Sequence, residues 1–536
     1  MAKKTGSGPL CPKCKKRRMA RNGSYSPGVP KWTCMTGSRS TGTFKICYST
    51  RDPHKPYRGH DAKPKRPEDA PKPVVHRVPL GNVERLVVTW AQNATPIHQP
   101  FLDALKTYCK ATGATLVVIA GRYKNPTSVW TDSQRNDERW APELAPYLHN
   151  TRKKLNDNLI LVGDVKLQPT AVTPLTGFDA LTGAESCILG HPKVQMKCIP
   201  TPQSQLPKIL TTTGAITRPN FTDSGAGKKG EFHHSYGAVV VELQGKLFHM
   251  RHLSAVADGA FIDLDTAYFP DGTTAKSGPW PALIFGDAHV AHIDPKVEKA
   301  TFGEGGLVDL LNPEVQVWHD LLDSYSVTPH HELNPMIKLA KYREGLNLAE
   351  KEVRSTVAWL RKRTVNRKSI VTASNHDDML SRWIMRADWK LDPANAEFYL
   401  ETALHMARSA KMGAGGASYI DPFQFWAHSL RGDSDIRCLG RGESFTVRGI
   451  ECGMHGDDGP GGSKGSVRNL SRLGVKVMSG HGHSPAIEEG HTRVGTMSYL
   501  QLEYNRGPSN WLNSHGGIDP FGKRHLFHVI NGKFRL

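Results

Sequence analysis

The sequence predicts a mixed α/β protein with a small metal-bound module at its amino end, and three observations support that fold class. An alternation of strand, helix and strand begins near residue 83, and a second alternation begins near residue 281. Each combines short, β-branched apolar runs with segments of helical spacing, which is typical of α/β domains. The first 60 residues lack this periodicity but contain four cysteines, which indicates a module folded around a metal ion.

The chain of 536 residues is too long for one ordinary hydrophobic core, so we expect several domains. Prolines at positions 64, 67, 71 and 73 predict an extended linker between the first module and the rest. The predicted parts are a basic zinc-ribbon-like module at 1–60, a Pro-rich linker at 61–82, an α/β domain of undefined role at 83–275, and a second α/β domain at 276–536.

Composition excludes several classes of protein. No apolar run reaches the 18 or so residues that a membrane span needs, so we expect no membrane partner. The basic amino terminus lacks the apolar segment of a secretory signal. Nine cysteines, an odd number, argue for reduced thiols instead of a disulfide framework. These features predict a cytoplasmic protein.

The positive charge is concentrated at the amino end. The net charge is +20, and residues 1–75 contain 18 Lys and Arg against 4 Asp and Glu. Such a segment attracts polyanions, and release of counterions from nucleic acid is the usual source of its affinity. The alternative interpretation is a solubilising or disordered tail.

Four cysteines near the amino terminus have the spacing C-x2-C-x19-C-x12-C. Four thiolates can close a tetrahedral zinc site and fold a segment that has almost no apolar core. The sequence therefore predicts one structural Zn²⁺, with His54 or His60 able to replace one thiol. The predicted zinc ligands are Cys11, Cys14, Cys34 and Cys47.

Basic and aromatic residues alternate around these cysteines, a mixture that suits phosphate contact and base stacking. The CPKC knuckle resembles the zinc ribbons of transposases and other DNA-handling proteins. That resemblance implies a nucleic-acid-binding module. The candidate contact residues are Arg17, Arg18, Arg21, Lys31 and Trp32.

The middle segment alternates between strands and a helix. We predict strands at 85–90, 115–121, 159–165 and 260–265, and a helix at 98–112, from apolar periodicity. The run SYGAVVVELQGKLFHMRHL predicts a hairpin that turns at Gln244 and Gly245.

The last segment resumes the alternation. We predict strands at 281–285, 369–373, 444–451 and 474–480. Helices are expected over 314–325, over 347–366 and within 378–411.

Polar motifs follow three of these strands directly: GDAH at 286–289, SNHD at 374–377 and GHGH at 480–483. Open α/β sheets place their ligand sites at the carboxyl ends of strands. Asp287 and His289 are two residues apart, so an extended backbone would point both side chains the same way, and the GHGH histidines repeat that spacing. Imidazole and carboxylate together suit zinc, manganese or iron.

In this order the motifs resemble the series of the calcineurin-like metallophosphoesterases: DxH, GD, GNHD or GNHE, a lone His, and GHxH. The resemblance covers about residues 281–500. It implies two sheets flanked by helices and two divalent metal ions, Mn²⁺ first, with Zn²⁺, Fe²⁺ or Mg²⁺ as alternatives. The implied ligands are Asp287 and His289 for the first metal, Asn375 and His455 for the second, and His481 and His483 for one metal each.

The second and third motifs depart from the family pattern. Ser374 replaces the usual glycine of the third motif. Asp320 is the predicted bridging carboxylate, with His319 in place of glycine, and Asp323 is the alternative. The resemblance further implies that His376 contacts the phosphate and protonates the leaving oxygen, with Asp377 beside it to fix its orientation.

These features lead to the hypothesis of a metal-dependent DNase. VTWAQNAT at 88–95 and AGRYKNPT at 120–127 resemble segments of the pre-early nucleases with which some tailed bacteriophages degrade host DNA. That likeness implies DNA as partner, the host cytoplasm as location, and a homodimer or higher oligomer as an open option. Two alternatives remain: a phosphatase acting on nucleotides or phosphoproteins, and a catalytically inactive DNA-binding regulator.

Overall fold

The computed structural model divides the chain into two compact units, Met1–Val74 and Val75–Leu536. Among the described residues, none of the helices combines the length and the apolar character that a membrane crossing requires. Residues 61–76 and 82 of the predicted linker, and also His54, His60 and Arg17, lie outside the residues that the structure describes. The described residues are 9–16, 18–26, 29–38, 43–50, 77–81, 83–123, 139–202, 205, 207–413 and 416–536.

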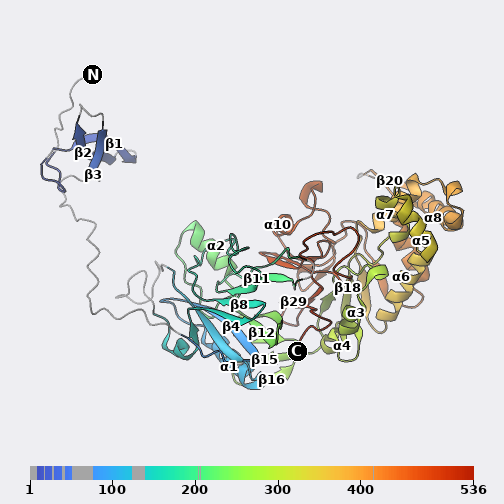
Figure 1. Ribbon diagram of the computed structural model, residues 1–536, viewed down its shortest axis with the longest axis horizontal. Coiled ribbons are helices and arrows are strands. Elements are labelled where there is room, and N and C mark those ends of the chain that lie inside the picture. Colours follow the sequence, from blue (N-terminus) through green and yellow to red (C-terminus); the bar gives the residue numbers. More distant parts are fainter. Residues whose placement is uncertain are drawn as a thin grey trace. The chain divides into compact units, whose positions relative to one another are not determined.

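The first unit is built on antiparallel strands in the order β1-β2-β3 (Figure 1). Their bounds are Ala20–Ser26, Val29–Ser38 and Thr43–Thr50. The buried cluster of this unit consists of Cys11, Met19 and Cys34, with Cys14 and Trp32 packed against it. This cluster is small and consists mainly of cysteines, so it buries little apolar surface and contributes little hydrophobic stabilisation. Such a core is expected of a module that needs a metal ion to fold.

A twisted sheet in the order β13-β12-β4-β5-β6 begins the second unit. The expected strands, helix and hairpin are confirmed, but the hairpin turns at Gly245 and Lys246, because Gln244 still pairs with Leu247. Gly245 has a φ of +56°, a conformation that glycine adopts readily. The elements are β4 Arg85–Gln92, α1 Gln99–Thr112, β5 Thr115–Gly121, β6 Leu148–His149, β12 Gly237–Gln244 and β13 Leu247–Ser254.

A second sheet, in the order β22-β19-β18-β17-β28-β29, positions half of the candidate site. Neighbouring strands from β17 to β22 run parallel, so their carboxyl ends meet at one edge. The bounds are β17 Ala282–Ile284, β18 Val315–Trp318, β19 Lys368–Val371, β22 Ile436–Cys438, β28 Ser514–Ile518 and β29 Arg524–His528.

Strand β18 corrects the prediction of a helix over 314–325. Its sequence VQVW pairs with β17 on one side and β19 on the other. Both faces of the central strand are covered, so its apolar residues need no alternation, and a short run of this kind resembles a buried helix segment by periodicity alone.

A third, mixed sheet joins the two segments that we expected as separate domains. Met196 in β10 pairs with Ile487 in β26, so residues from 83–275 and 276–536 share one sheet. Both segments belong to the compact unit Val75–Leu536, and no boundary at 275 separates them in it. The strands of this third sheet are, in spatial order, β23 Thr446–Val447, β24 Ile450–Glu451, β25 Lys476–Ser479, β27 His491–Arg493, β26 Ala486–Glu488, β10 Met196–Ile199, β11 Lys208–Thr212, β9 Ser186–Leu189, β8 Leu159–Val162 and β7 Arg152–Asn156.

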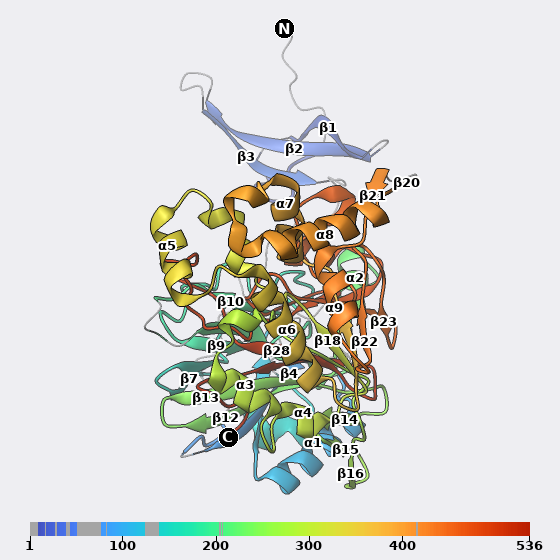
Figure 2. The ribbon, with the colours of Figure 1, turned by 90° about the vertical axis from the view of Figure 1, so that its right-hand side faces the viewer.

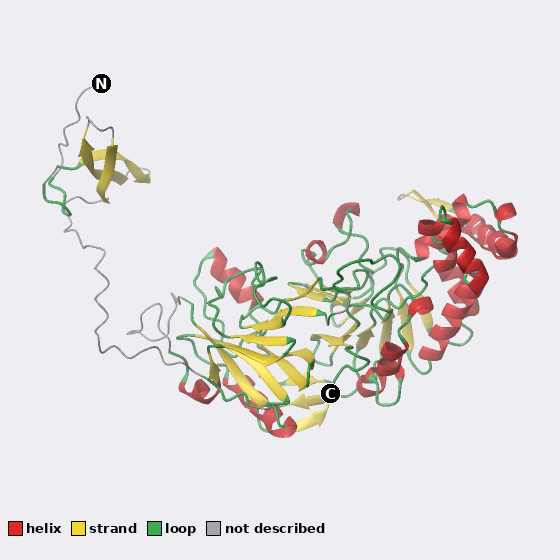
Figure 3. Cartoon of the chain, viewed as in Figure 1, coloured by secondary structure: helices red, strands yellow, loops and turns green. Residues whose placement is uncertain are grey.

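Helices cover the outer face of the second sheet, and Figure 2 shows α3, α4 and α6 in front of β18 and β28. Helix α6 buries Val353, Val357 and Leu360 at helical spacing, and Arg361–Arg363 end it with charges that favour its dipole. Most of the helices gather at one end of this unit (Figure 3). Their bounds are α3 Pro295–Phe302, α4 Leu307–Leu311, α5 Pro335–Glu344, α6 Ala349–Arg363, α7 Asp377–Arg386, α8 Ala396–Ser409 and α9 Pro422–Leu430.

Several smaller elements, besides short 3-10 helices, belong to the described fold. They are α2 Gly225–His233, α10 Val467–Leu470, the hairpin strands β14 Phe261–Asp263, β15 Thr266–Tyr268 and β16 Thr274–Lys276, and the pair β20 Lys411–Gly413 and β21 Gly416–Ser418.

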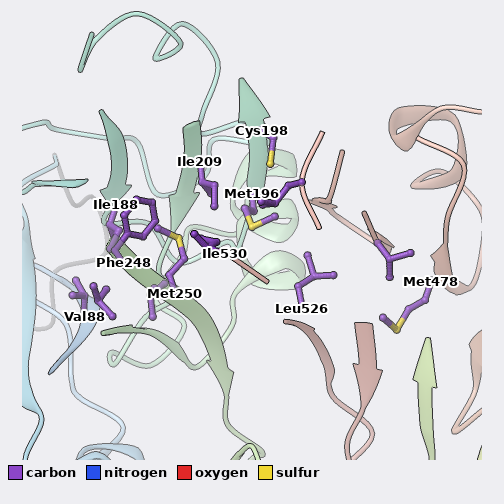
Figure 4. Close-up of a cluster of buried hydrophobic side chains, with 14 of the residues drawn as sticks. Val88, Ile188, Met196, Cys198, Ile209, Phe248, Met250, Met478, Leu526 and Ile530 are labelled. Atoms are coloured by element: carbon purple, nitrogen blue, oxygen red, sulfur yellow. The ribbon is translucent and has the colours of Figure 1, made fainter. Parts of the chain in front are cut away.

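One of the hydrophobic clusters described in the second unit combines residues of both segments. It includes Val88 and Ile188 from the middle segment together with Met478 and Leu526 from the last one (Figure 4). Burial of each such side chain contributes about 1.5–3 kcal/mol. The second unit is therefore a mixed α/β body of several sheets flanked by helices, and this body holds the candidate site at strand ends.

Candidate metal centre

The candidate ligands come from five chain segments that end at one place. GDAH follows β17, Asp320 follows β18, SNHD follows β19, His455 follows β24, and GHGH follows β25. The expected metal ligands lie together in the fold although they are spread over almost 200 positions of the sequence. They are Asp287, His289, Asp320, Asn375, His455, His481 and His483.

A first group of side chains consists of Asp287, His289, Asp320 and His483, all buried. Each offers one ligand atom, and these atoms lie within 4.8 Å of one another. His289 Nε2 is 2.9 Å from His483 Nε2, and His483 Nε2 is 3.1 Å from Asp287 Oδ2. Two imidazole nitrogens close to each other and to two carboxylates are a suitable ligand set for zinc, manganese or iron.

A second group consists of Asp320, His455 and His481, whose ligand atoms also lie within 4.8 Å of one another. Asn375 Oδ1 completes it, 3.1 Å from His455 Nε2 and 3.0 Å from His481 Nδ1. Asp320 belongs to both groups. Its Oδ2 is 3.1 Å from His455 Nε2, while its buried Oδ1 has no hydrogen-bond partner. A buried carboxylate oxygen without a partner is costly, and a second cation beside it would remove that cost.

The charges in the centre favour ionised carboxylates. Burial alone would raise the pKa of Asp320, but His455 and His376 hold it well below its usual range. In the same way, the neighbouring histidines outweigh burial at Asp287 and lower its pKa to about 2. At His455, the carboxylate of Asp320 outweighs burial and raises the pKa to about 9. The centre therefore attracts positive charge, whether protons or metal ions.

Asp323 lies beside the first group and orients its rings. Its Oδ1 is 2.8 Å from His289 Nδ1, and its Oδ2 is 3.4 Å from His292 Nε2. Its backbone carbonyl accepts a hydrogen bond from His376 Nδ1 at 2.8 Å. A carboxylate that binds the far nitrogen of a ligand histidine fixes the ring and its tautomer. The sequence offered Asp323 only as an alternative bridge, and Asp320 occupies the place between the two groups.

Asp377 does not orient His376 in the way that we expected. Its Oδ2 accepts a hydrogen bond from Ser374 N at 3.0 Å, while Asp377 N donates to Ser374 Oγ at 3.3 Å. Because α7 begins at Asp377, the carboxylate and hydroxyl close the turn before the first helical residues. Ser374, where the predicted motif has glycine, thus has a structural role, and His376 Nδ1 donates its hydrogen bond to the carbonyl of Asp323.

The backbone around the centre also differs from the extended geometry predicted for Asp287 and His289. His289 has a φ of +42°, and the GHGH histidines His481 and His483 have φ values of +70° and +49°. Asp320 has a φ of +42° as well. Non-glycine residues in this region cost about 1–3 kcal/mol each and occur mainly at functional sites. The turns, and not an extended strand, therefore aim these side chains inward.

Glycine is required at position 480 because the chain passes very close to the centre. A Cβ there would lie 2.1 Å from Asp287 Oδ1 and 2.9 Å from His319 Cβ. The close approach lets His481 N donate to Asp287 Oδ1 at 3.0 Å. His319 packs in the same place, with Nδ1 2.9 Å from Thr372 Oγ1, and burial lowers its pKa to about 4. His319, at the position where the predicted motif has glycine, thus fits beside Asp320.

The first unit brings three of the four predicted zinc ligands together. The sulfurs of Cys11, Cys14 and Cys34 lie within 4.8 Å of one another, and those of Cys14 and Cys34 are 3.8 Å apart. The register pairs Cys34 with Tyr48 and Met35 with Ile46, so Cys47 is the bulged residue between them. The side chain of Cys47 is not among those that the structure describes. Three clustered thiols with a fourth cysteine on the neighbouring strand fit a structural zinc ion.

Three of the five candidate nucleic-acid contacts have side chains that the structure describes. Arg18 is exposed, and Lys31 is half-buried. Trp32 packs partly against the cysteine cluster, so part of its ring serves the fold of the module. The side chain of Arg21 is not described.

We expect Cys14→Ser to reduce the zinc content of the purified chain by about one equivalent, because a structural site needs its full ligand set. The measurement is mass spectrometry of metals after removal of loosely bound ions. Cys109→Ser in α1 is the matched control, since this cysteine lies outside the cluster, and it should leave the zinc content unchanged. Equal zinc in wild type and Cys14→Ser would contradict the site.

Together the fold and these clusters define a mixed α/β protein with buried histidine and aspartate groups that could bind metal ions. The chain is 31% identical over 467 residues to protein A1 of Escherichia phage T5, an alignment that covers 84% of this chain and 83% of that protein. It therefore belongs to the family of that protein and is a phage-related protein. Neither a family model nor a solved structure matches the chain.

Proposed function

We propose that this protein hydrolyses phosphodiester bonds of DNA at the candidate metal centre, with two divalent metal ions. The observation that carries the proposal is the position of Asp320, which belongs to both ligand groups and has one oxygen without a partner. Carboxylates shared in this way hold metal pairs, and a pair about 3.5–4 Å apart activates water and stabilises the oxygens of an in-line displacement. Mn²⁺ is the expected metal, and Zn²⁺, Fe²⁺ and Mg²⁺ are the alternatives.

The side chains of the centre fall into two sets of metal ligands and one proton donor. Asp287, His289, Asp320 and His483 would hold one ion, and Asp320, Asn375, His455 and His481 would hold the other. With Nδ1 bound to the carbonyl of Asp323, His376 has Nε2 available to hold a proton for the leaving oxygen.

DNA is the proposed substrate because of the first unit. The excess of Lys and Arg over residues 1–75 attracts a polyanion, and a zinc-ordered module would present part of that charge. The relationship to a phage protein fits an enzyme that acts on host DNA during infection.

We expect purified protein to cleave linear DNA in Mn²⁺ and to lose this activity in a chelator, with recovery on adding Mn²⁺ back. His376→Ala should lower the rate by about 10²–10⁴, the usual contribution of a proton donor. His405→Ala in α8, a histidine outside the centre, is the control and should cleave at the wild-type rate.

The same assay includes circular DNA, RNA and p-nitrophenyl phosphate. Cleavage of the monoester alone would replace the proposal with a phosphatase. DNA binding without metal-dependent turnover would replace it with a binding protein whose metal centre is structural.

A further inference from the structure

An open cleft with aromatic walls lies next to the metal centre. It has a volume of about 490 Å³, and its lining includes His292, Tyr325, Tyr504 and Arg506. His292 Nε2 is 3.4 Å from Asp323 Oδ2, so this wall of the cleft contacts the residue that orients the ligand histidine. The cleft therefore lies beside the centre, with His292 and Asp323 between the two.

Aromatic ring contacts also connect the metal centre with Tyr504 of the cleft wall. The ring of Trp511 stands edge-on to that of His483, with centroids 4.1 Å apart. Tyr504 meets Trp511 with a centroid distance of 5.8 Å. Tyr504 is nevertheless 53% exposed. A tyrosine so exposed is not needed to fill the core, and its free face is available to a ligand.

The segment that carries these rings is held in place by its own hydrogen bonds. Asn505 Oδ1 accepts from Leu502 N at 2.7 Å, and Asn505 Nδ2 donates to Leu500 O at 2.9 Å. Glu503 pairs with His331 at 2.6 Å, which ties the segment to the short 3-10 helix Pro329–His331. A wall fixed before the ligand arrives loses little entropy on binding.

We propose that this cleft binds the nucleotide next to the scissile phosphate, with its base stacked on Tyr504, whose ring contacts Trp511. This inference rests on the proposed function. The guanidinium of Arg506, exposed at the cleft, would contact a neighbouring phosphate. Every base has an aromatic face, so such stacking is tolerant of sequence. A base paired and stacked within a duplex cannot enter the cleft, so the site takes single-stranded segments or frayed ends.

The test compares two substrates with the full-length protein in Mn²⁺: a thymidine oligonucleotide and an abasic deoxyribose phosphate polymer of equal length. Wild type should have the lower KM on thymidine. Tyr504→Ala should raise that KM about tenfold, the usual effect of losing one stacked base, and bring the KM ratio of the two polymers toward one. Tyr504→Phe keeps the ring and should keep the ratio. Tyr342→Ala, an exposed tyrosine on α5, is the matched control.

The inference is overturned if Tyr504→Ala raises the KM of both polymers equally, or if Tyr504→Phe is as damaging as alanine. If wild type cleaves neither polymer, the proposed function fails instead. Fluorescence anisotropy of the same labelled polymers in Ca²⁺ then decides the inference alone. Tighter binding of thymidine that Tyr504→Ala abolishes would support the cleft, whereas equal binding by wild type and variant would reject it.

Discussion

Asp320→Ala is expected to lower Mn²⁺-dependent DNA cleavage by about a thousandfold or more, because charge stabilisation by the metal pair is worth several kcal/mol. Asp320 is the carboxylate common to both ligand groups, so its loss weakens the binding of both ions. The variant also leaves buried His455 without the oxygen that lies 3.1 Å from its Nε2. Initial rates and bound manganese per chain, measured on the same preparations, check the prediction.

Asp323→Asn is the matched control for this variant. It lies three residues away and is buried to a similar degree, but it contacts the far nitrogen of His289. Loss of such a partner costs about 10–100-fold in activity or metal affinity. A larger loss in Asp323→Asn than in Asp320→Ala would reverse the two assignments.

Asp263→Ala is expected to reduce the free energy of unfolding by about 3–5 kcal/mol, since it removes the nearer of the two carboxylates that pair with buried Arg251 and leaves only Glu242, at 3.2 Å. Arg251 donates to Asp263 through Nε at 2.5 Å and through Nη2 at 2.7 Å, and Tyr108 donates its hydroxyl at 2.9 Å. These residues join α1, β13 and β14. Urea unfolding followed by tryptophan fluorescence measures the change.

The neighbouring Asp265 provides the control, because its ion pair with Lys276 is exposed on the lysine side. Asp265→Ala should change stability by only about 0–1 kcal/mol. Comparable losses in the two variants would contradict the account of the buried network.

The stability that the Asp263 carboxylate contributes depends on pH in a defined direction. Burial raises the pKa of Asp263, but Arg251 outweighs burial and holds the pKa below its usual value. The contribution of the carboxylate is therefore complete above about pH 4, the pKa of an unfolded aspartate. It is lost as the pH falls through the lower folded value.

The sequence allowed most of the candidate site to be located before the structure. Each of the motifs GDAH, SNHD and GHGH follows an apolar strand, and parallel strands bring their carboxyl ends to one edge. What the sequence could not show was the shape of the turns. Left-handed backbone at His289 and Asp320 depends on tertiary contacts, such as the hydrogen bond from His289 N to Asp320 O at 2.7 Å.

Three other features were beyond sequence reasoning. The helix predicted over 314–325 is strand β18, because a short apolar run carries no periodicity that separates a covered strand from a helix. The role of Asp377 was assigned by its adjacency to His376, but the start of α7 turns its carboxylate toward Ser374. The pairing of β10 with β26 joins positions almost 300 residues apart, and local patterns do not reveal such contacts.

Anomalous X-ray diffraction from crystals soaked in Mn²⁺ tests the central claim most directly. The account predicts two manganese peaks per chain in the centre, one among Asp287, His289 and His483 and one among Asn375, His455 and His481. Asp320 would lie between them and contact both. A single peak, or two peaks without Asp320 between them, would contradict the two-metal centre.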